Sequence, residues 1–225
     1  MNYTQTRASG SRKKISGSTI KIIAIVTMVI GIVATAVLDR ILLKNGLSDV
    51  ANDAEAYQAF METNGTLFIT DFVMQLIGGL AFPLFCFLLV EGFMHTSDLK
   101  KYAIGLGIVA LISEIPFDLV YSGVVLNPYR QNPVFSLLLG LGVLVLIEKA
   151  EAALAQSPSW KQTSLKLLII VAACAVSVLL HFDYGIFGTL IIVILYILRN
   201  RQIFGMALAC FLMSTTSQIL GFLTF

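Results

Sequence analysis

Two pairs of polar residues sit at a spacing suited to acid–base chemistry inside otherwise apolar segments. Glu91 and His95 are four residues apart, so on a helix they share one face about one turn apart. A carboxylate in that position can fix the tautomer of an imidazole and keep it basic, as an orienting group does for a general base. The same spacing also describes an interfacial pair that ends a helix near lipid headgroups, and spacing alone leaves both interpretations open.

Glu114 and Asp118 repeat this spacing and enclose Pro116. Two carboxylates on one helix face repel each other unless a cation intervenes, and Arg130 in the following loop is a candidate counter-ion. A proline removes one helix hydrogen bond, which in membrane proteins is typical of helices that line a polar cavity. We therefore expect this segment to be functional.

A third polar group consists of His181, Asp183 and Tyr184. It comes directly before Gly185, a residue that gives the backbone freedom for a tight turn. It is either a binding site or simply the turn between two helices. The predicted catalytic residues are Glu91, His95, Glu114 and Asp118. The predicted substrate-binding residues are Asp71, Arg130, His181, Asp183 and Tyr184.

Composition identifies the medium in which these side chains must work. Of the 225 residues, 57% are apolar and only 12% are charged, and the mean hydropathy is +0.88. Soluble domains carry about 25% charged residues, so lipid is the solvent that fits this chain. Ionisable side chains inside a lipid-spanning helix are costly, and each is therefore a functional candidate by default.

Seven apolar segments are candidate transmembrane helices, with six and eight as alternatives because the sixth segment is short. A helical crossing takes about 20 mostly apolar residues. The first segment has some features of a cleavable signal peptide, but its apolar length of about 24 residues favours an uncleaved helix. The predicted fold is an all-α, polytopic bundle with spans at Thr19–Leu43, Leu67–Met94, Lys101–Tyr121, Val134–Ala153, Leu165–His181, Ile186–Leu198 and Ile203–Phe222.

The basic residues predict the orientation of the bundle. With a cytoplasmic N-terminus, twelve of the fifteen Lys and Arg residues are cytoplasmic, as the positive-inside rule requires. The three on the outer side are Arg40, Lys44 and Arg130. We predict a multi-pass cell-membrane protein with a disordered basic cytoplasmic tail at 1–18 and a single transmembrane domain at 19–225. An outer loop is expected at 44–66, with a turn at Asn64-Gly65, and a cytoplasmic linker at 154–163.

Several chemistries find no support in the sequence. Cys86, Cys174 and Cys210 lie inside apolar runs, which indicates packing thiols, so neither a disulfide framework nor a metal site is expected. The chain has no phosphate-cradling glycine loop and no nucleophile-elbow serine, and its short basic tail does not indicate nucleic-acid binding. The expected partner is the lipid bilayer, together with an acceptor substrate.

The order of several motifs resembles the TraX family of membrane proteins. The motifs are Gly78-Gly79-Leu80-Ala81-Phe82-Pro83-Leu84-Phe85, Glu91-Gly92-Phe93-Met94-His95-Thr96, Ser113-Glu114-Ile115-Pro116-Phe117-Asp118, Leu137-Leu138-Leu139-Gly140 and Asp183-Tyr184-Gly185. The match covers about residues 15–190. The resemblance implies a bacterial inner-membrane acyltransferase linked to conjugation, with acetyl-CoA as the donor and a peptide N-terminus or an envelope glycan as the acceptor.

The chain departs from the family pattern at four positions. The resemblance implies an Asp-His pair where this chain has Gly31 and Ile32, and arginines where it has Gly79 and Gly105. Acyl transfer needs a base and a donor set for the developing oxyanion. The glycines are expected to leave space in place of that charge.

Three functions follow as hypotheses. The first is acyl transfer with Glu91 and His95 near cytoplasmic acetyl-CoA, and with an acceptor cavity lined by Glu114, Asp118 and Asp183. The second is a catalytically silent scaffold that keeps the fold and binds a partner. The third, a small transporter, is disfavoured because the sequence shows no internal repeat.

The predicted topology can be tested by labelling from outside the cell. Single cysteines at Ser48 and at Gln156 should react with an impermeant maleimide from opposite sides of the membrane, because the two positions lie in connections of opposite sidedness. Labelling of both positions from the outside would contradict the predicted arrangement.

Overall fold

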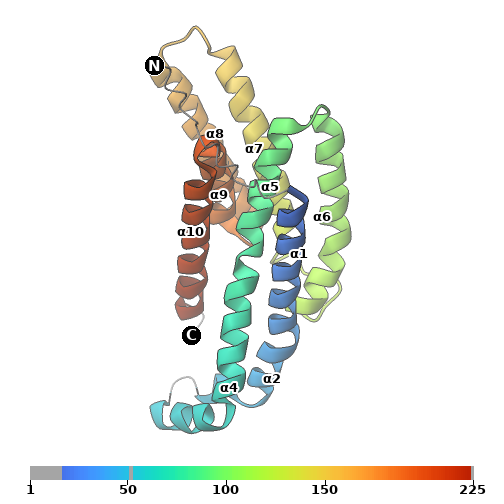
Figure 1. Ribbon diagram of the computed structural model, residues 1–225, viewed down its shortest axis with the longest axis vertical. Coiled ribbons are helices and arrows are strands. Elements are labelled where there is room, and N and C mark those ends of the chain that lie inside the picture. The colour runs from blue at the N-terminus through green and yellow to red at the C-terminus, as the bar shows by residue number, and fades with distance from the viewer. Residues whose placement is uncertain (1–16, 51–52, 224–225) are drawn as a thin grey trace, which may run out of the picture.

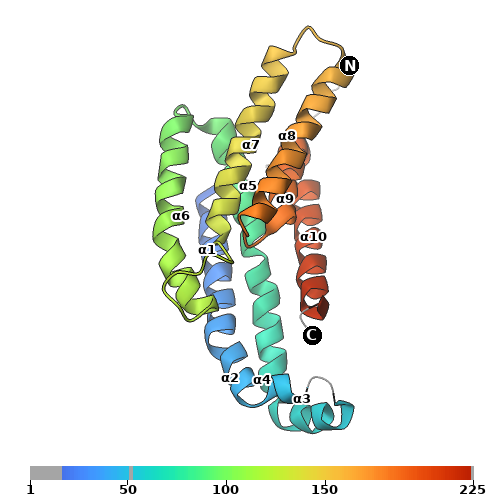
Figure 2. The ribbon, with the colours of Figure 1, turned by 180° about the vertical axis from the view of Figure 1, so that it is seen from behind.

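The computed structural model describes residues 17–50 and 53–223, with side chains up to Met213, and this part of the chain is helical without a strand. The predicted all-α fold is therefore confirmed. The predicted tail at 1–18 lies outside the described residues except for Gly17 and Ser18, which begin the first helix. The elements form one elongated bundle (Figures 1 and 2).

The helices follow the predicted apolar segments closely. They are α1 (Gly17–Val33), the π-helical η1 (Ala34–Asp39), α2 (Arg40–Lys44), α3 (Leu47–Val50), α4 (Ala54–Gly79), α5 (Ala81–His95), α6 (Leu99–Tyr121), α7 (Pro133–Ala153), α8 (Ser159–Leu179), α9 (Gly185–Ile197), the 3-10 turn η2 (Arg199–Arg201) and α10 (Gln202–Leu223). Within the described residues, five helical segments are long and apolar enough to cross a membrane: Gly17–Lys44, Ala54–His95, Leu99–Tyr121, Pro133–Ala153 and Ser159–Leu179.

The last two predicted spans do not form two full crossings. α9 has 13 residues, about 20 Å of helix, whereas the hydrocarbon layer is about 30 Å thick. The chain bends by 78° between Gly185–Ile197 and Arg199–Met213, and the pair counts as at most one broken span. The described part of the chain therefore has five spans, or six with this pair, instead of the seven that were favoured.

α9 lies at the centre of the bundle and packs against α5, α7, α8 and α10. Seven of its residues are buried, including Ile191, Ile192 and Tyr196. A helix that is apolar on every side can be surrounded by other helices or by lipid. Here four helices surround it, and at 13 residues it is too short to cross the hydrocarbon layer alone.

The first helix is held against the second span by direct backbone contact. A Cβ atom added at Gly78 would lie only 2.5 Å from the Cα of Gly31, and one added at Gly31 would lie 2.9 Å from the Cα of Gly78. Small residues let helix backbones approach in this way in membranes. The expectation that Gly31 leaves open space is therefore wrong, because its space is filled by α4.

The predicted turn at Asn64-Gly65 is also wrong, because α4 runs through both residues. Asp53 caps the start of the helix, and its side chain accepts hydrogen bonds from the N–H groups of Glu55 and Ala56. The Asn64 amide accepts a hydrogen bond from Asn45 at 2.8 Å and donates to the carbonyl of Phe60 at 3.3 Å. With its side chain bonded in this way, Asn64 continues the helix instead of ending it.

The connections sort the charged residues to two ends of the bundle. The α5–α6 and α7–α8 connections lie at the upper end in Figure 1. The α9–α10 connection belongs to the same end, because Gln202 donates a hydrogen bond to Glu91, near the end of α5, at 2.8 Å. We name this end the basic end, because its connections and flanking turns carry Lys100, Lys101, Lys149, Lys161, Lys166, Arg199 and Arg201. The α7–α8 connection is shorter than the predicted linker, since α8 already begins at Ser159.

The glycine contact generates a stability prediction with a neighbouring control. Gly78→Ala should lower the free energy of unfolding by about 1–3 kcal/mol, because the new methyl group must push two backbones apart. Gly79→Ala should have little effect, since a Cβ there meets nothing within 4 Å. Thermal unfolding of the purified protein in detergent measures both, and equal transition temperatures would show that the close approach is not required.

Candidate functional site

The Glu91–His95 pair occupies the last turns of α5 at the basic end. The Nδ1 atom of His95 lies 2.9 Å from the backbone carbonyl oxygen of Glu91 and 3.8 Å from its carboxylate Oε2. Because a carbonyl oxygen can only accept a hydrogen bond, Nδ1 carries the proton and Nε2 of the neutral ring is left as the acceptor. With 76% of its side chain exposed, His95 is accessible to a substrate.

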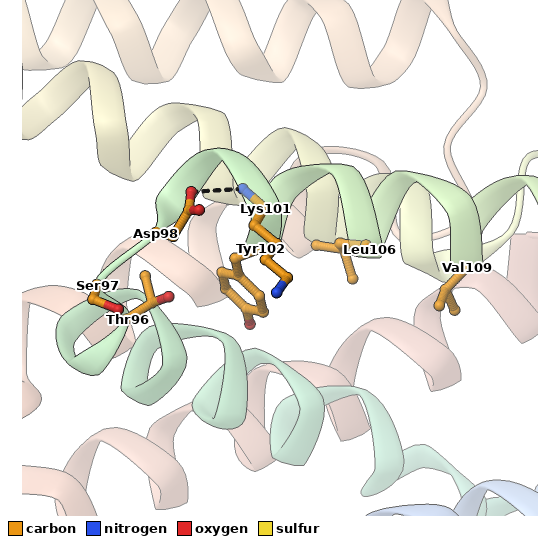
Figure 3. A pocket seen from close by; sticks show the side chains of 8 residues that line it. Thr96, Ser97, Asp98, Lys101, Tyr102, Leu106 and Val109 are labelled. Carbon is orange, nitrogen blue, oxygen red and sulfur yellow. Dashed lines mark hydrogen bonds between the residues drawn. The ribbon is translucent and has the colours of Figure 1, made fainter.

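The residues that follow this pair, Thr96 and Ser97, begin the lining of an open hollow of about 820 Å³, which we call the α6 hollow (Figure 3). Glu91 and His95 themselves do not line it. Its volume is in the range of small-molecule sites. The hollow is lined by Thr96, Ser97, Asp98, Lys101, Tyr102, Gly105, Leu106 and Val109. Asp98 fixes the start of α6 by accepting a hydrogen bond from the N–H of Lys101 at 2.9 Å.

Two glycines shape the α6 hollow. A Cβ at Gly92 would lie 2.8 Å from the hydroxyl oxygen of Tyr102, so this glycine allows the tyrosine of α6 to touch α5. At Gly105 a Cβ would meet nothing within 4 Å, as was expected for this position and for Gly79. Gly92 therefore allows α5 and α6 to come together at the rim, and Gly105 leaves space in the wall of the hollow.

The two acids of α6 hold the loop that follows this helix. Glu114 accepts hydrogen bonds from the backbone N–H of Asn132, at 3.1 Å, and from its side-chain amide. Asp118, only 1% exposed, accepts from the backbone N–H of Asn127 at 2.7 Å. The predicted catalytic role of both acids therefore has a structural alternative, which is to anchor residues 122–132.

Arg130 is not the counter-ion of these acids. Its Nε donates to Asp183 Oδ1 at 2.5 Å, and its guanidinium carbon lies 4.6 Å from the ring centre of Tyr121. Only 8% of the Asp183 side chain is exposed. The backbone of Gln131 joins the two segments further, by donating to the carbonyl of His181 at 2.9 Å and accepting from the N–H of Asp183 at 3.0 Å.

The predicted substrate-binding residues His181 and Asp71 belong to different elements. His181 is exposed, has a φ of 53°, and its ring meets Tyr129 edge-on at 6.4 Å. Asp71 is buried on α4 and accepts a hydrogen bond from Gln75 at 3.0 Å, while its Oδ1 has no partner among the described residues.

The predicted catalytic and acceptor-lining residues do not form one site. The ring of Tyr184 stacks on Phe82 with 3.8 Å between ring centres. Phe82 precedes His95 by thirteen residues along the second span, which corresponds to about 20 Å of helix. His95 therefore cannot exchange a proton directly with a substrate held at Arg130 and Asp183.

Sequence reasoning missed several residues of these sites. Lys101 was read only as a marker of topology, and Tyr102 and Gln202 were not singled out. Asn132 had a usable signal, because an Asn before a Pro is typical of a helix start, and here its side chain caps α7 by accepting from Val134 at 2.9 Å.

A comparison with known families decides the relationship of the chain. A family model described as TraX protein matches residues 16–223. The chain belongs to the TraX family. No curated protein and no solved structure matches it. At the positions where the resemblance implies the first-span Asp-His pair, this TraX protein has Gly31 packed on α4 and Ile32 with 37% of its surface exposed.

A metal site is not found among the described side chains of this TraX protein. Among residues 17–50 and 53–213, no group of three or more His, Cys, Asp or Glu side chains is arranged to hold an ion. His95 and His181 are the two histidines of the chain. His181 lines a hollow of about 380 Å³ together with Gln131 and Phe135. His95 has a ring oriented by the Glu91 carbonyl and directly precedes Thr96, which lines the α6 hollow.

The ion pair between the half-exposed Arg130 and the buried Asp183 predicts a measurable coupling. Arg130→Leu should lower the free energy of unfolding by about 2 kcal/mol, because it leaves the carboxylate of Asp183 buried without its cation. Adding Asp183→Asn should restore most of this loss. Lys166→Leu is the matched control, since Lys166 and Glu151 also lie 2.5 Å apart but are more exposed than Asp183, and it should cost less than about 1 kcal/mol. Equal effects of the two Leu variants would contradict this account.

Proposed function

We propose that this TraX-family protein is a membrane acyltransferase that uses acetyl-CoA at its basic end. The observation that supports this most is the His95 ring, whose Nδ1 contacts a carbonyl oxygen while Nε2 is left to act as a base beside the α6 hollow. We place this end in the cytoplasm, because it gathers the basic residues and because the positive-inside rule then holds.

The residues around His95 fit a phosphate-bearing donor. Lys100 is exposed next to the hollow, and Arg201 is exposed next to Gln202, which bonds to Glu91. Both cations lie at the basic end without lining the hollow, so they can hold the phosphates of the donor. The donor supplies an activated acyl thioester.

In this proposal His95 works as a general base. Its Nε2 takes the proton of an acceptor amine or hydroxyl while that group attacks the acyl carbon, and returns the proton to the leaving thiolate. The Glu91 carboxylate, 3.8 Å from Nδ1, stabilises the imidazolium between these two steps. The Glu91 carbonyl keeps the ring oriented throughout. A peptide N-terminus and an envelope glycan both carry suitable acceptor groups.

A catalytically silent scaffold is the second candidate, and a specific observation favours it. The first-span positions at which the resemblance implies the Asp-His pair cannot hold it here, because α4 fills the space at Gly31 and Ile32 lies on the exposed surface of α1. A chain that lost its catalysis would retain helix packing at these positions. The scaffold hypothesis predicts no acyl transfer at all.

The two histidines give a matched test of these alternatives. His95→Gln should lower transfer of a labelled acetyl group from acetyl-CoA by about 100-fold or more, which is the usual contribution of a general base. His181→Gln should leave it within about two-fold, because His181 lies at the α8–α9 turn, away from the basic end. Purified protein in native-lipid nanodiscs, followed by mass spectrometry of the products, gives both rates. Transfer that survives in His95→Gln would refute the proposed base, and its absence in the natural chain would favour the scaffold.

A further inference from the structure

The α6 hollow extends well into the membrane-spanning part of α6. Its lining residues run from Asp98, which caps α6, to Val109 on that helix, as a stripe at helical spacing. Eleven residues of helix correspond to about 16 Å, roughly half of the hydrocarbon layer. An occupant that fills the hollow therefore reaches from the interface into the bilayer core.

The polarity of the wall changes along this path. At the rim stand two hydroxyl residues, Thr96 and Ser97, and the cation Lys101, whose side chain turns toward the hollow together with the ring of Tyr102 (Figure 3). Deeper in, the wall consists of Gly105, Leu106 and Val109. The gradient from charge to hydrocarbon matches a molecule with a charged head and an apolar chain.

The hollow is open on the side that faces the bilayer. α6 packs along α7 and, at its far end, against η1, and in Figure 1 it stands at the edge of the bundle. The outer surface of α6 next to the hollow is apolar and half exposed, as at Ile108 and Val109 with 52% each. A hydrocarbon chain can therefore enter sideways from the bilayer, whereas a hydrophilic donor arm would gain nothing against this wall.

We propose that the α6 hollow binds one phospholipid of the surrounding bilayer, with its phosphate at Lys101 and one acyl chain along Gly105, Leu106 and Val109. The phosphate accepts hydrogen bonds from the ammonium group and from the hydroxyls of the rim. Such a lipid brings a headgroup amine or hydroxyl to the level of His95. Resting on the proposed function, we assign this lipid as the acyl acceptor.

Filling the hollow tests the binding site directly. In nanodiscs that contain phosphatidylethanolamine with a photoactivatable acyl chain, crosslinks should map to residues 101–109. Gly105→Leu should reduce these crosslinks several-fold, because its side chain enters the hollow. Gly142→Leu is the matched control, since Gly142 is an exposed helical glycine of α7 that also has nothing within 4 Å of a Cβ. Unchanged crosslinking in Gly105→Leu would overturn the lipid site.

A second variant keeps the test independent of how well Gly105→Leu folds. Lys101→Gln removes the rim cation but keeps the backbone N–H that Asp98 caps, and it should also reduce the crosslinks several-fold. Acetyl transfer to phosphatidylethanolamine in the same nanodiscs then tests the acceptor. Transfer to a soluble amine but not to the lipid would overturn the acceptor assignment, whereas no transfer to either would overturn the proposed function and leave the crosslinks to decide the lipid site.

Discussion

In a bilayer, two helices gain little by burying apolar surface against each other, because lipid is as apolar as their side chains. Close packing and polar contacts must then hold the bundle. The backbone contact of Gly31 with Gly78 joins the first two spans, and Arg40 donates to the carbonyls of Leu119 and Val120 at the end of α6. The elements that position His95 depend on these few contacts.

The buried acids follow from the same constraint. A carboxylate inside the membrane is costly unless it is hydrogen-bonded. Glu114 and Asp118 accept hydrogen bonds from backbone amides of the loop that directly follows α6. The loop in turn places Arg130 against Asp183. The polar residues Glu114, Asp118 and Arg130 thus bond to residues 122–132 and to the α8–α9 turn. His95, at the basic end, is exposed.

The sequence predicted the first five spans well, because each is long and apolar, whereas the predicted sixth span is the 13-residue helix α9. The helical fold, the α5 end with its Glu91–His95 spacing and the family could all be inferred from the sequence. Which residues of distant segments bond to each other could not be inferred from the sequence. Arg130 is close in sequence to Glu114 but bonds to Asp183, 53 residues away, and the Asn64-Gly65 turn signal was overridden by a bond to Asn45. The α6 hollow was invisible because it depends on how far α6 stands from α5.

The half-length helix α9 has a consequence for the way the chain enters the membrane. The insertion machinery recognises a segment by its length and its hydrophobicity, and thirteen residues fall short of a full span. The preceding turn also carries Asp183, whose cation lies on a loop made earlier in synthesis. α9 packs against α5, α7 and α8, which precede it in the chain, so most of its place in the bundle is lined by helices that are made before it.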